Sequence, residues 1–414
     1  MESRVWRSTK QYAVQRAVRA LLAALARDVD RNAVLLATLA ERVAGAEHSR
    51  RQLRWVRERF AEGHPCLTLA NRVLHEAHPN CRRRLVENLF VNNTWLGDRQ
   101  RQDVEARYGL RPPHLLVISP TMRCNLRCYG CYAGAYDQKD DLPFDTWNRI
   151  ITEGKALGIY FYTISGGEPF FRRDLFDIAE RHSDCYFQVY TNGVLLDEAV
   201  VTRIVECGNL SPSISIEGFE QATDERRGTG IWRKINAAMD ELRRQGAIYG
   251  FSGTVTSQNA DVMASRELMD WLVAKGCYYG WFFTYIPIGR EPALELMPTP
   301  QQRNRLREWT LQVRRTYPIF AADFWNDGPL VGCCMAGGRL YAHINHQGDV
   351  EPCVFTHFAV DNVKEKPLAE CLGSAFFRDI RSRQPYDENP LRPCMIIDNP
   401  HVLREVVEIG RAHV

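Results

Sequence analysis

Three cysteines that follow an apolar run are spaced closely enough to share one inorganic group. Cys124, Cys128 and Cys131 form a C-x3-C-x2-C triplet after the apolar segment 115–120. A structural zinc site or a self-contained iron–sulfur cluster uses four protein ligands. Three thiolates around a [4Fe–4S] cluster leave one iron open to a small molecule. The alternative is a zinc loop that takes its fourth ligand from a distant part of the sequence.

A glycine pair follows the next apolar run. The segment reads Ser165-Gly166-Gly167-Glu168-Pro169. Glycines let a backbone approach a ligand closely, and Glu168 offers an acceptor for an ammonium group, although such a turn is common in isolation. Together with the cysteine spacing, the segment resembles the GGEP motif of the radical S-adenosylmethionine (radical SAM) superfamily. The resemblance implies a [4Fe–4S] cluster on the triplet, with SAM at its open iron and its methionine amino group at residues 165–168.

Three later segments resemble further SAM contacts of that family. Asn192 lies in a Thr-Asn-Gly turn, and Ser215 and Glu217 stand where relatives place polar groups near the ribose. Arg226 and Arg227 stand where relatives keep an arginine for the SAM carboxylate, which a guanidinium fork suits. A pair of surface arginines is the alternative; we take Arg227 as the candidate.

One position departs from the family pattern. Relatives usually have an aromatic residue directly before the third cysteine, near the adenine of SAM, whereas this sequence has Gly130 there. Tyr129 and Tyr132 flank it. We take Tyr129 as the candidate for the adenine contact, with Tyr132 as the alternative.

The C-terminal cysteines carry a second pattern. Cys334, Gly348 and Cys353 fit C-x(9–15)-G-x4-C, which resembles the opening of the SPASM and Twitch modules, and segment 341–353 is typical of a hairpin with a glycine turn. The C-x2-C-x5-C-x3-C run of a full SPASM module is absent from the sequence. We therefore predict one auxiliary [4Fe–4S] cluster on Cys334, Cys353 and Cys394.

The fourth ligand of that cluster stays open between Cys333, Cys371, a non-cysteine group and the substrate. Cys333 has a second possible role. Its thiol, adjacent to a predicted ligand, is the best-placed catalytic hydrogen donor if the reaction is an epimerisation.

The elements that position these residues alternate in type. Six apolar, β-rich runs are separated by amphipathic helical patterns, at 115–121, 159–165, 186–190, 211–216, 250–256 and 279–286. Such alternation predicts an α/β fold with a parallel sheet, whose sites lie at the carboxyl ends of the strands. Six repeats fit the partial (β/α)6 barrel of the radical SAM family.

Four regions follow from these patterns. We predict a basic helical N-terminal region (1–112), a barrel (113–290), a linker with one helix at 301–316 (291–330) and a Twitch- or SPASM-like cluster domain (331–414). Apolar residues recur at helical spacing between residues 13 and 25 and again near 33–43. No winged-helix pattern for a leader peptide is evident.

Composition narrows the class of protein. The chain has 414 residues, 45% of them hydrophobic, and 13 cysteines. Because exposed iron–sulfur ligands need reducing conditions, we expect a cytoplasmic protein. Residues 1–112 hold 21 Lys and Arg against 12 Asp and Glu; without interleaved aromatic residues this predicts a solvated helical face rather than a nucleic-acid site. The short apolar stretch 17–26 is interrupted by arginine and predicts no membrane span.

The resemblance implies an enzyme. SAM is cleaved reductively, and the 5′-deoxyadenosyl radical removes a hydrogen atom from a substrate. We expect a flavodoxin- or ferredoxin-type electron donor, and oligomerisation through the N-terminal helices is possible. The favoured substrate is a small molecule or oligosaccharide, with a carbohydrate epimerase or alcohol dehydrogenase of natural-product biosynthesis as the activity. The sequence is also similar to sugar epimerases of avilamycin-type antibiotic assembly. The alternative is a maturase of ribosomally made peptides.

Overall fold

The computed structural model describes residues 28–43, 47–137 and 139–410, together with Arg16, Ala20 and Leu25. The apolar stripe between residues 13 and 25 lies almost wholly outside these residues.

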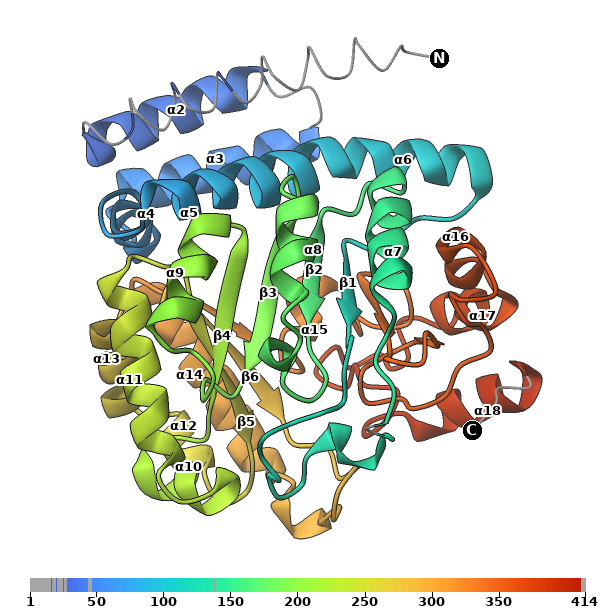
Figure 1. Cartoon of the computed structure of the whole chain (residues 1–414). Helices are drawn as coiled ribbons and strands as arrows, with labels where there is room; N and C mark the ends of the chain where they lie inside the picture. The colour runs from blue at the N-terminus through green and yellow to red at the C-terminus, as the bar shows by residue number, and fades with distance from the viewer. Residues whose placement is uncertain are drawn as a thin grey trace.

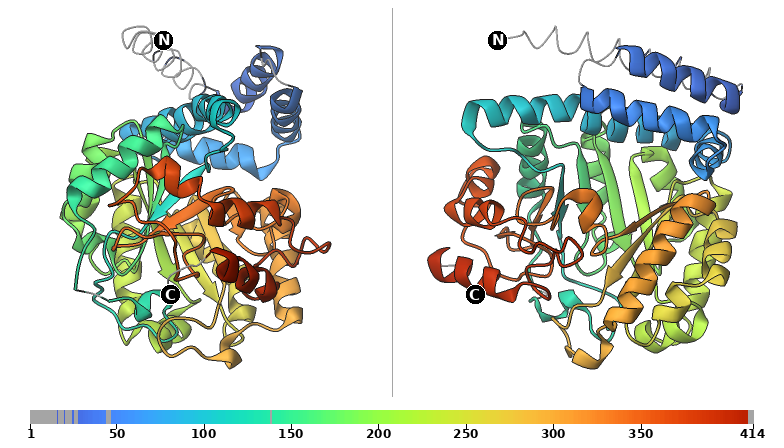
Figure 2. Two further views of the ribbon diagram at one scale, coloured as in Figure 1. Left: turned by 90° about the vertical axis from the view of Figure 1, so that its right-hand side faces the viewer. Right: turned by 180° about the vertical axis from the view of Figure 1, so that it is seen from behind.

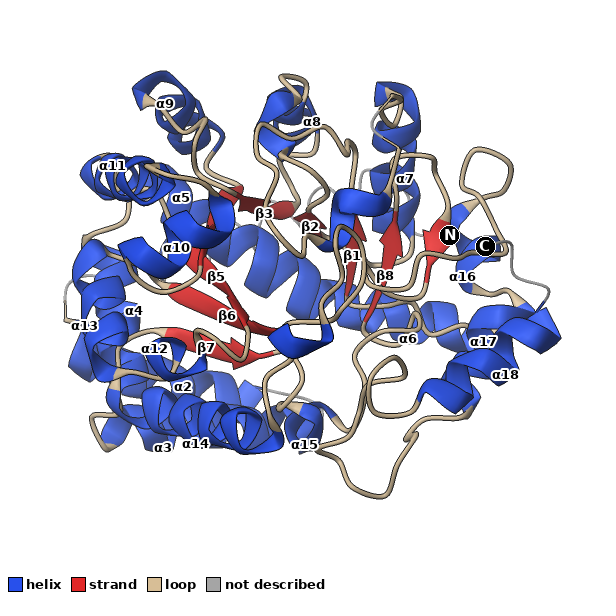
Figure 3. Cartoon of the chain, turned by 90° about the horizontal axis from the view of Figure 1, so that it is seen from below, coloured by secondary structure: helices blue, strands red, loops and turns tan. Residues whose placement is uncertain are grey.

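One nine-stranded sheet forms the centre of the molecule, in the order β7-β6-β5-β4-β3-β2-β1-β8-β9. All neighbours are parallel except β8 and β9. The barrel strands are β1 (Leu115–Ile118), β2 (Phe161–Ile164), β3 (Tyr186–Thr191), β4 (Leu210–Ile216), β5 (Gly250–Val255) and β6 (Tyr279–Thr284). They curl into an arc with helices outside it (Figure 3). The partial (β/α)6 barrel is therefore confirmed.

Helices cover the outside of this arc. They are α7 (Phe144–Ala156), α8 (Leu175–Arg181), α9 (Glu198–Cys207), α10 (Glu220–Arg227), α11 (Ile231–Arg244), α12 (Ala260–Met263), α13 (Arg266–Lys275) and α14 (Pro300–Thr316). In α11, Ile231, Ile235, Met239 and Leu242 recur at three- and four-residue spacing and are all buried. This periodicity places one face of the helix on the core.

The sequence indicated neither the strand β7 nor the pairing of β8 with the barrel. β7 (Phe320–Asp323) pairs with β6 inside the segment that we expected to be a linker and helix. The strand β8 (Tyr341–Ile344) adds to β1 in the register Leu115↔Tyr341, and it forms with β9 (Val350–Glu351) the hairpin predicted from the glycine turn. The C-terminal region thus continues the barrel sheet beyond the expected boundary at residue 331.

The rest of the C-terminal region is short helices and loops. Its helices are α15 (Gly328–Val331), α16 (Leu368–Leu372), α17 (Ala375–Ser382) and α18 (Pro400–Gly410). This region lies together on one side of the barrel, as both views of Figure 2 show.

A helical layer crosses the amino ends of the strands (Figure 1). It contains α2 (Val29–Val43), α3 (Glu47–Ala61), α4 (Pro65–His75), α5 (Pro79–Arg84), a π-helical stretch (Leu85–Leu96) and α6 (Gly97–Tyr108). Among its described residues every regular element is a helix, as the sequence predicted. No described helix combines the length and apolarity needed to cross a membrane.

Polar side chains of this layer bind the backbone in front of successive strands. Asn88 Nδ2 donates to the carbonyls of Ser183 (3.0 Å) and Cys185 (2.8 Å), which precede β3. Arg101 Nη1 donates to the Gly158 carbonyl (2.6 Å), before β2. Because buried carbonyl groups need partners, these side chains close the amino end of the barrel.

The same pattern continues around the sheet. Asn80 Nδ2 donates to the Val205 carbonyl (2.9 Å), before β4. Arg72 Nη1 donates to the Cys277 carbonyl (3.1 Å) and the Pro318 carbonyl (2.9 Å), before β6 and β7. We expected the basic residues of this region to lie on a solvated face. Two of them, Arg72 and Arg101, instead donate hydrogen bonds to backbone carbonyls of the barrel.

This role predicts a stability loss at Asn88, which is 1% exposed. Asn88→Leu keeps the volume but removes one of the two side-chain donors from each carbonyl, leaving Arg84 on Ser183 and Asn209 on Cys185. Because two hydrogen bonds are lost, the free energy of unfolding should fall by about 1–3 kcal/mol. The exposed Asn304→Leu is the control and should change it by less than about 0.5 kcal/mol. Urea denaturation of both variants measures the difference, and equal values would contradict the assigned role.

Candidate active site

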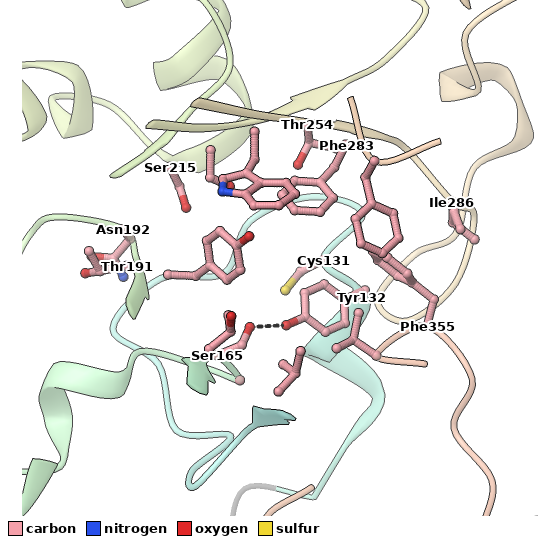
Figure 4. Close-up of a pocket in the computed structure, with 18 of the residues that line it drawn as sticks. Cys131, Tyr132, Ser165, Thr191, Asn192, Ser215, Thr254, Phe283, Ile286 and Phe355 are labelled. Atoms are coloured by element: carbon pink, nitrogen blue, oxygen red, sulfur yellow. Dashed lines mark hydrogen bonds between the residues drawn. The ribbon is translucent and has the colours of Figure 1, made fainter. Parts of the chain in front are cut away.

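One cavity at the carboxyl ends of the strands gathers the first set of predicted residues. Cys124, Cys128 and Cys131 line it together with Ser165, Gly166, Gly167, Asn192, Ser215, Arg226 and Arg227. Figure 4 shows Cys131, Ser165, Asn192 and Ser215 around this space. Residues from separate loops thus meet where a parallel sheet positions its ligands.

The glycine pair has a steric reason. A Cβ on Gly167 would stand 2.2 Å from the Arg123 carbonyl oxygen, and one on Gly166, where φ is +109°, would stand 2.3 Å from the Thr121 carbonyl oxygen. The backbone N–H of Gly167 donates to that Thr121 oxygen (2.9 Å). The turn after β2 therefore packs directly on the backbone that enters the cysteine loop.

Glu168 braces this turn instead of lining the cavity. Its carboxylate is fully buried and accepts hydrogen bonds from Thr191 Oγ1 (2.8 Å) and from the backbone N–H groups of Phe170 (3.1 Å) and Asn192 (2.8 Å). Burial raises the pKa of Glu168 to about 7 against the effect of these bonds. Glu168 thus joins the turns after β2 and β3, and its contact with the ammonium group of SAM stays a prediction.

Glu217 has a comparable role for the arginines. It lies outside the cavity lining and is 1% exposed. Its Oε1 accepts from Arg226 Nη1 (2.5 Å) and from Arg227 Nε (2.9 Å) and Nη2 (2.5 Å). Arg226 Nε also donates to the Tyr129 carbonyl in the cysteine loop (3.1 Å). One buried carboxylate therefore orients both guanidinium groups toward the cavity.

The aromatic residues beside Gly130 include one that we did not expect from the sequence. Tyr129 is 38% exposed and lies outside the lining, whereas Tyr132 and Tyr285 belong to it. A Cβ on Gly130 would stand 2.8 Å from Tyr285 Cε2. Tyr285, at the end of β6, thus occupies the space beside this glycine. Sequence reasoning missed it because only the fold brings the two segments together.

A second, smaller cavity holds the C-terminal cysteines. Cys334, Cys353 and Cys394 all line it, among apolar neighbours. Cys333 is buried but belongs to the lining of neither cavity. Cys371 lies in α16, where burial raises its pKa to about 12 and Asp361 is a neighbour. The structure therefore brings together the three predicted ligands, and neither Cys333 nor Cys371 joins them.

The donors around these sulfurs suit thiolate ligands. The backbone N–H of Leu126 lies 3.4 Å from Cys124 Sγ, and that of Ile396 lies 3.3 Å from Cys394 Sγ. Hydrogen bonds to sulfur stabilise thiolates and tune iron–sulfur clusters. No three His, Cys, Asp or Glu side chains among the described residues stand close enough to share a single metal ion; the ligands of a four-iron cluster stand further apart than those of one ion.

The two cavities share a wall of side chains. Ile286, Phe324, Met335 and Phe355 line both of them. Tyr341 lines the first cavity, and its hydroxyl lies 2.9 Å from Cys353 Sγ. Figure 4 shows Phe355 and Ile286 on this side of the site. One layer of side chains thus separates the cysteine sites.

Comparison with known families agrees with this arrangement. Residues 118–260 match the model of the radical SAM superfamily, and residues 333–395 match that of the SPASM iron–sulfur cluster-binding domain. The protein is a radical SAM enzyme. Its radical SAM domain uses SAM and a [4Fe–4S] cluster, and its SPASM domain binds auxiliary iron–sulfur clusters.

Similar proteins extend over most of this enzyme. The AdoMet-dependent heme synthase of Methanosarcina barkeri is 25% identical over 300 residues, or 65% of this enzyme and 85% of the relative. The PqqA peptide cyclase of Granulibacter bethesdensis is 26% identical over 69% of this enzyme and 80% of its own length. The mycofactocin maturase MftC of Mycobacterium tuberculosis is 28% identical over 67% and 74%.

Solved structures share the fold of this radical SAM enzyme. SuiB of Streptococcus suis, bound to S-adenosylmethionine, superposes with a TM-score of 0.60 at 18% identity, covering 72% of this enzyme and 75% of SuiB. The enzyme anSMEcpe with bound AdoMet gives 0.54 at 15% identity over 72% and 96%. At these identities the likeness concerns the architecture alone.

The Glu217 contacts predict a change in SAM affinity. Glu217→Gln removes the charge that orients Arg226 and Arg227, so the Kd for SAM should rise at least about tenfold. The matched variant Glu220→Gln, exposed on α10, should leave it unchanged. Anaerobic equilibrium dialysis of the reconstituted enzyme measures both, and an unaltered Kd for Glu217→Gln would contradict the orienting role.

Proposed function

We propose that this radical SAM enzyme modifies a peptide. The observation that carries the proposal is the similarity, over two thirds of the protein, to the PqqA peptide cyclase and the mycofactocin maturase, at 26% and 28% identity. The main expectation from the sequence was a sugar epimerase, with a peptide maturase as the alternative; the relatives favour the alternative. Cys333, the hydrogen donor of the epimerase hypothesis, lines neither cavity.

We assign separate roles to the residues that line the first cavity. We assign Cys124, Cys128 and Cys131 as cluster ligands, and the backbone at Gly166 and Gly167 as the surface that SAM approaches. When bound, the cluster and SAM supply a radical that removes a hydrogen atom from a substrate C–H bond. The aromatic and apolar lining excludes water, which would otherwise compete for reactive groups.

We assign the second cavity to one auxiliary cluster on Cys334, Cys353 and Cys394. Its place beyond the shared wall suits it to accept an electron from a substrate radical, which an oxidative peptide modification requires. A flavodoxin- or ferredoxin-type protein is the proposed donor for SAM cleavage.

Tetrapyrrole chemistry is the second candidate, because the heme synthase of M. barkeri matches a similar share of the protein. Incubation with SAM, dithionite and either a precursor peptide encoded beside the gene or an iron porphyrin separates the two. Peptide modification predicts a mass change of the peptide together with 5′-deoxyadenosine. Turnover of the porphyrin, with an unchanged peptide, would reverse the assignment.

Single cysteine substitutions test the two cluster sites. Cys128→Ala should abolish 5′-deoxyadenosine formation, whereas Cys334→Ala should retain it and lose the modified product. Each should lose about four iron atoms per protein molecule. Cys371→Ala is the control and should keep the full iron content, because its thiol lines neither cavity. Iron analysis and mass spectrometry give the result, and iron loss in the control would refute the ligand set.

The Tyr341 hydroxyl should tune the auxiliary cluster. A hydrogen bond to a ligand sulfur stabilises the reduced, more negative state, so Tyr341→Phe should make the reduction potential of this cluster more negative while SAM cleavage continues. Tyr386→Phe is the matched control, since its hydroxyl accepts from Gln384 Nε2 (2.9 Å) and lies 3.8 Å from Met395 Sδ, and it makes no hydrogen bond to a described cysteine. Redox titration followed by electron paramagnetic resonance tests this, and equal shifts in both variants would contradict it.

A further inference from the structure

The first cavity continues from the cysteine loop along the inner face of the barrel. Its lining includes side chains that alternate along the strands, such as Gln188 and Tyr190 on β3 and Trp281 and Phe283 on β6. Successive residues of a strand point to opposite faces, and the residue between the β3 pair, Val189, belongs to the outer core. We call this inner part of the cavity the barrel chamber.

Aromatic rings form one side of the barrel chamber. Phe283 makes ring contacts with Tyr190 (centroids 5.7 Å apart), Trp281 (6.2 Å) and Phe324 (5.4 Å). Phe324 in turn contacts Tyr341 (5.8 Å). Such a surface takes up an aromatic or branched aliphatic group well, because apolar area leaves water and rings pack edge to face.

Charge is scarce in this lining. Among the described lining residues there is no Asp, Glu, Lys or His, and the two arginines present are Arg226 and Arg227. Both are paired with Glu217 beside the cysteine loop. A carboxylate or ammonium group brought into the barrel chamber would therefore lose its water without gaining a partner of opposite charge, which is unfavourable.

The side-chain amide of Gln188 has an N–H group available for hydrogen bonding in the barrel chamber. Gln188 is 4% exposed, and its Nε2 forms no hydrogen bond of ordinary geometry. Burial raises the pKa of Tyr190, whereas a side-chain hydrogen bond with the neighbouring Gln188 acts in the opposite direction. The amide has two N–H groups, so at least one of them is left for a ligand. An unsatisfied buried donor of this kind suits a neutral acceptor such as a carbonyl or hydroxyl oxygen.

We infer that the residue on which the enzyme acts carries an uncharged aromatic or branched aliphatic side chain that enters the barrel chamber, and that a hydroxyl on this side chain, where it has one, accepts a hydrogen bond from Gln188. The inference rests on the proposed function and names the class of residue that a peptide must offer. In the chemical step a C–H bond of the substrate residue breaks, and its hydrogen atom forms the new C–H bond at C5′ of deoxyadenosine. The electron for SAM cleavage comes from the added reductant.

Deuterium transfer tests this selectivity. The reconstituted enzyme is incubated anaerobically with SAM, dithionite and one side-chain-deuterated N-acetyl amino acid amide at a time: valine, tyrosine, glutamate or lysine. We expect the valine and tyrosine amides to place at least tenfold more deuterium in 5′-deoxyadenosine than the glutamate and lysine amides do. Mass spectrometry of 5′-deoxyadenosine measures the transfer.

Two variants of Gln188 sharpen the test. Gln188→Glu places a carboxylate in the barrel chamber, so transfer from the lysine amide should rise at least tenfold while transfer from the valine amide falls. Gln188→Met removes the donor without adding charge and should lower transfer from the tyrosine amide more than from the valine amide. Gln301→Glu, exposed at the start of α14, is the control and should leave the order unchanged.

The outcomes separate the inference from the function on which it rests. Equal or greater transfer from the glutamate or lysine amide with the unaltered enzyme overturns the inference and leaves a peptide substrate standing. Absence of deuterium from all four amides, with transfer from a deuterated hexose instead, overturns both the inference and the peptide function.

Discussion

The parallel pairing of β8 with β1 determines how the two cysteine sites lie. β1 leads into the loop that carries Cys124, and the β8–β9 hairpin leads to Cys353, so a single ladder in the register Leu115↔Tyr341 fixes one site against the other. The side chains that line both cavities are those of the shared wall. That wall includes Tyr341, which touches both sites.

A buried polar network holds this junction. Ser119 Oγ, at the end of β1, lies 2.7 Å from His343 Nε2, and His343 Nδ1 lies 2.6 Å from Glu351 Oε2. Tyr136, beyond the cysteine loop, donates to both oxygens of Glu351 (2.9 Å each). Because a buried network is stable only when its members are satisfied together, the cysteine loop and the hairpin before Cys353 are held as one unit.

The sequence predicted the parts of the enzyme that depend on local pattern. Strand periodicity and the cysteine spacing located the barrel and both groups of thiols. The placements that the sequence did not indicate depend on tertiary packing: Glu168 and Tyr129 are in the expected segments but outside the cavity lining, and Cys333 lines neither cavity. Tyr285 was missed because its partner, Gly130, lies 155 positions away in the sequence, and no local signal links them.

Because the amino end of the barrel is closed, the barrel chamber is open to a substrate only at the carboxyl ends of the strands. Side chains such as Asn88 and Arg101 bind the backbone in front of the strands, so the helical layer covers the end opposite the cysteines. In the arrangement we propose, a substrate side chain enters from the carboxyl ends, and its deepest atoms reach Gln188 and the rings of β6. The proposed function therefore places the reacting carbon between the first cysteine site and the shared wall. This order places hydrogen abstraction before the wall and electron acceptance beyond it, which is the sequence that an oxidative modification requires.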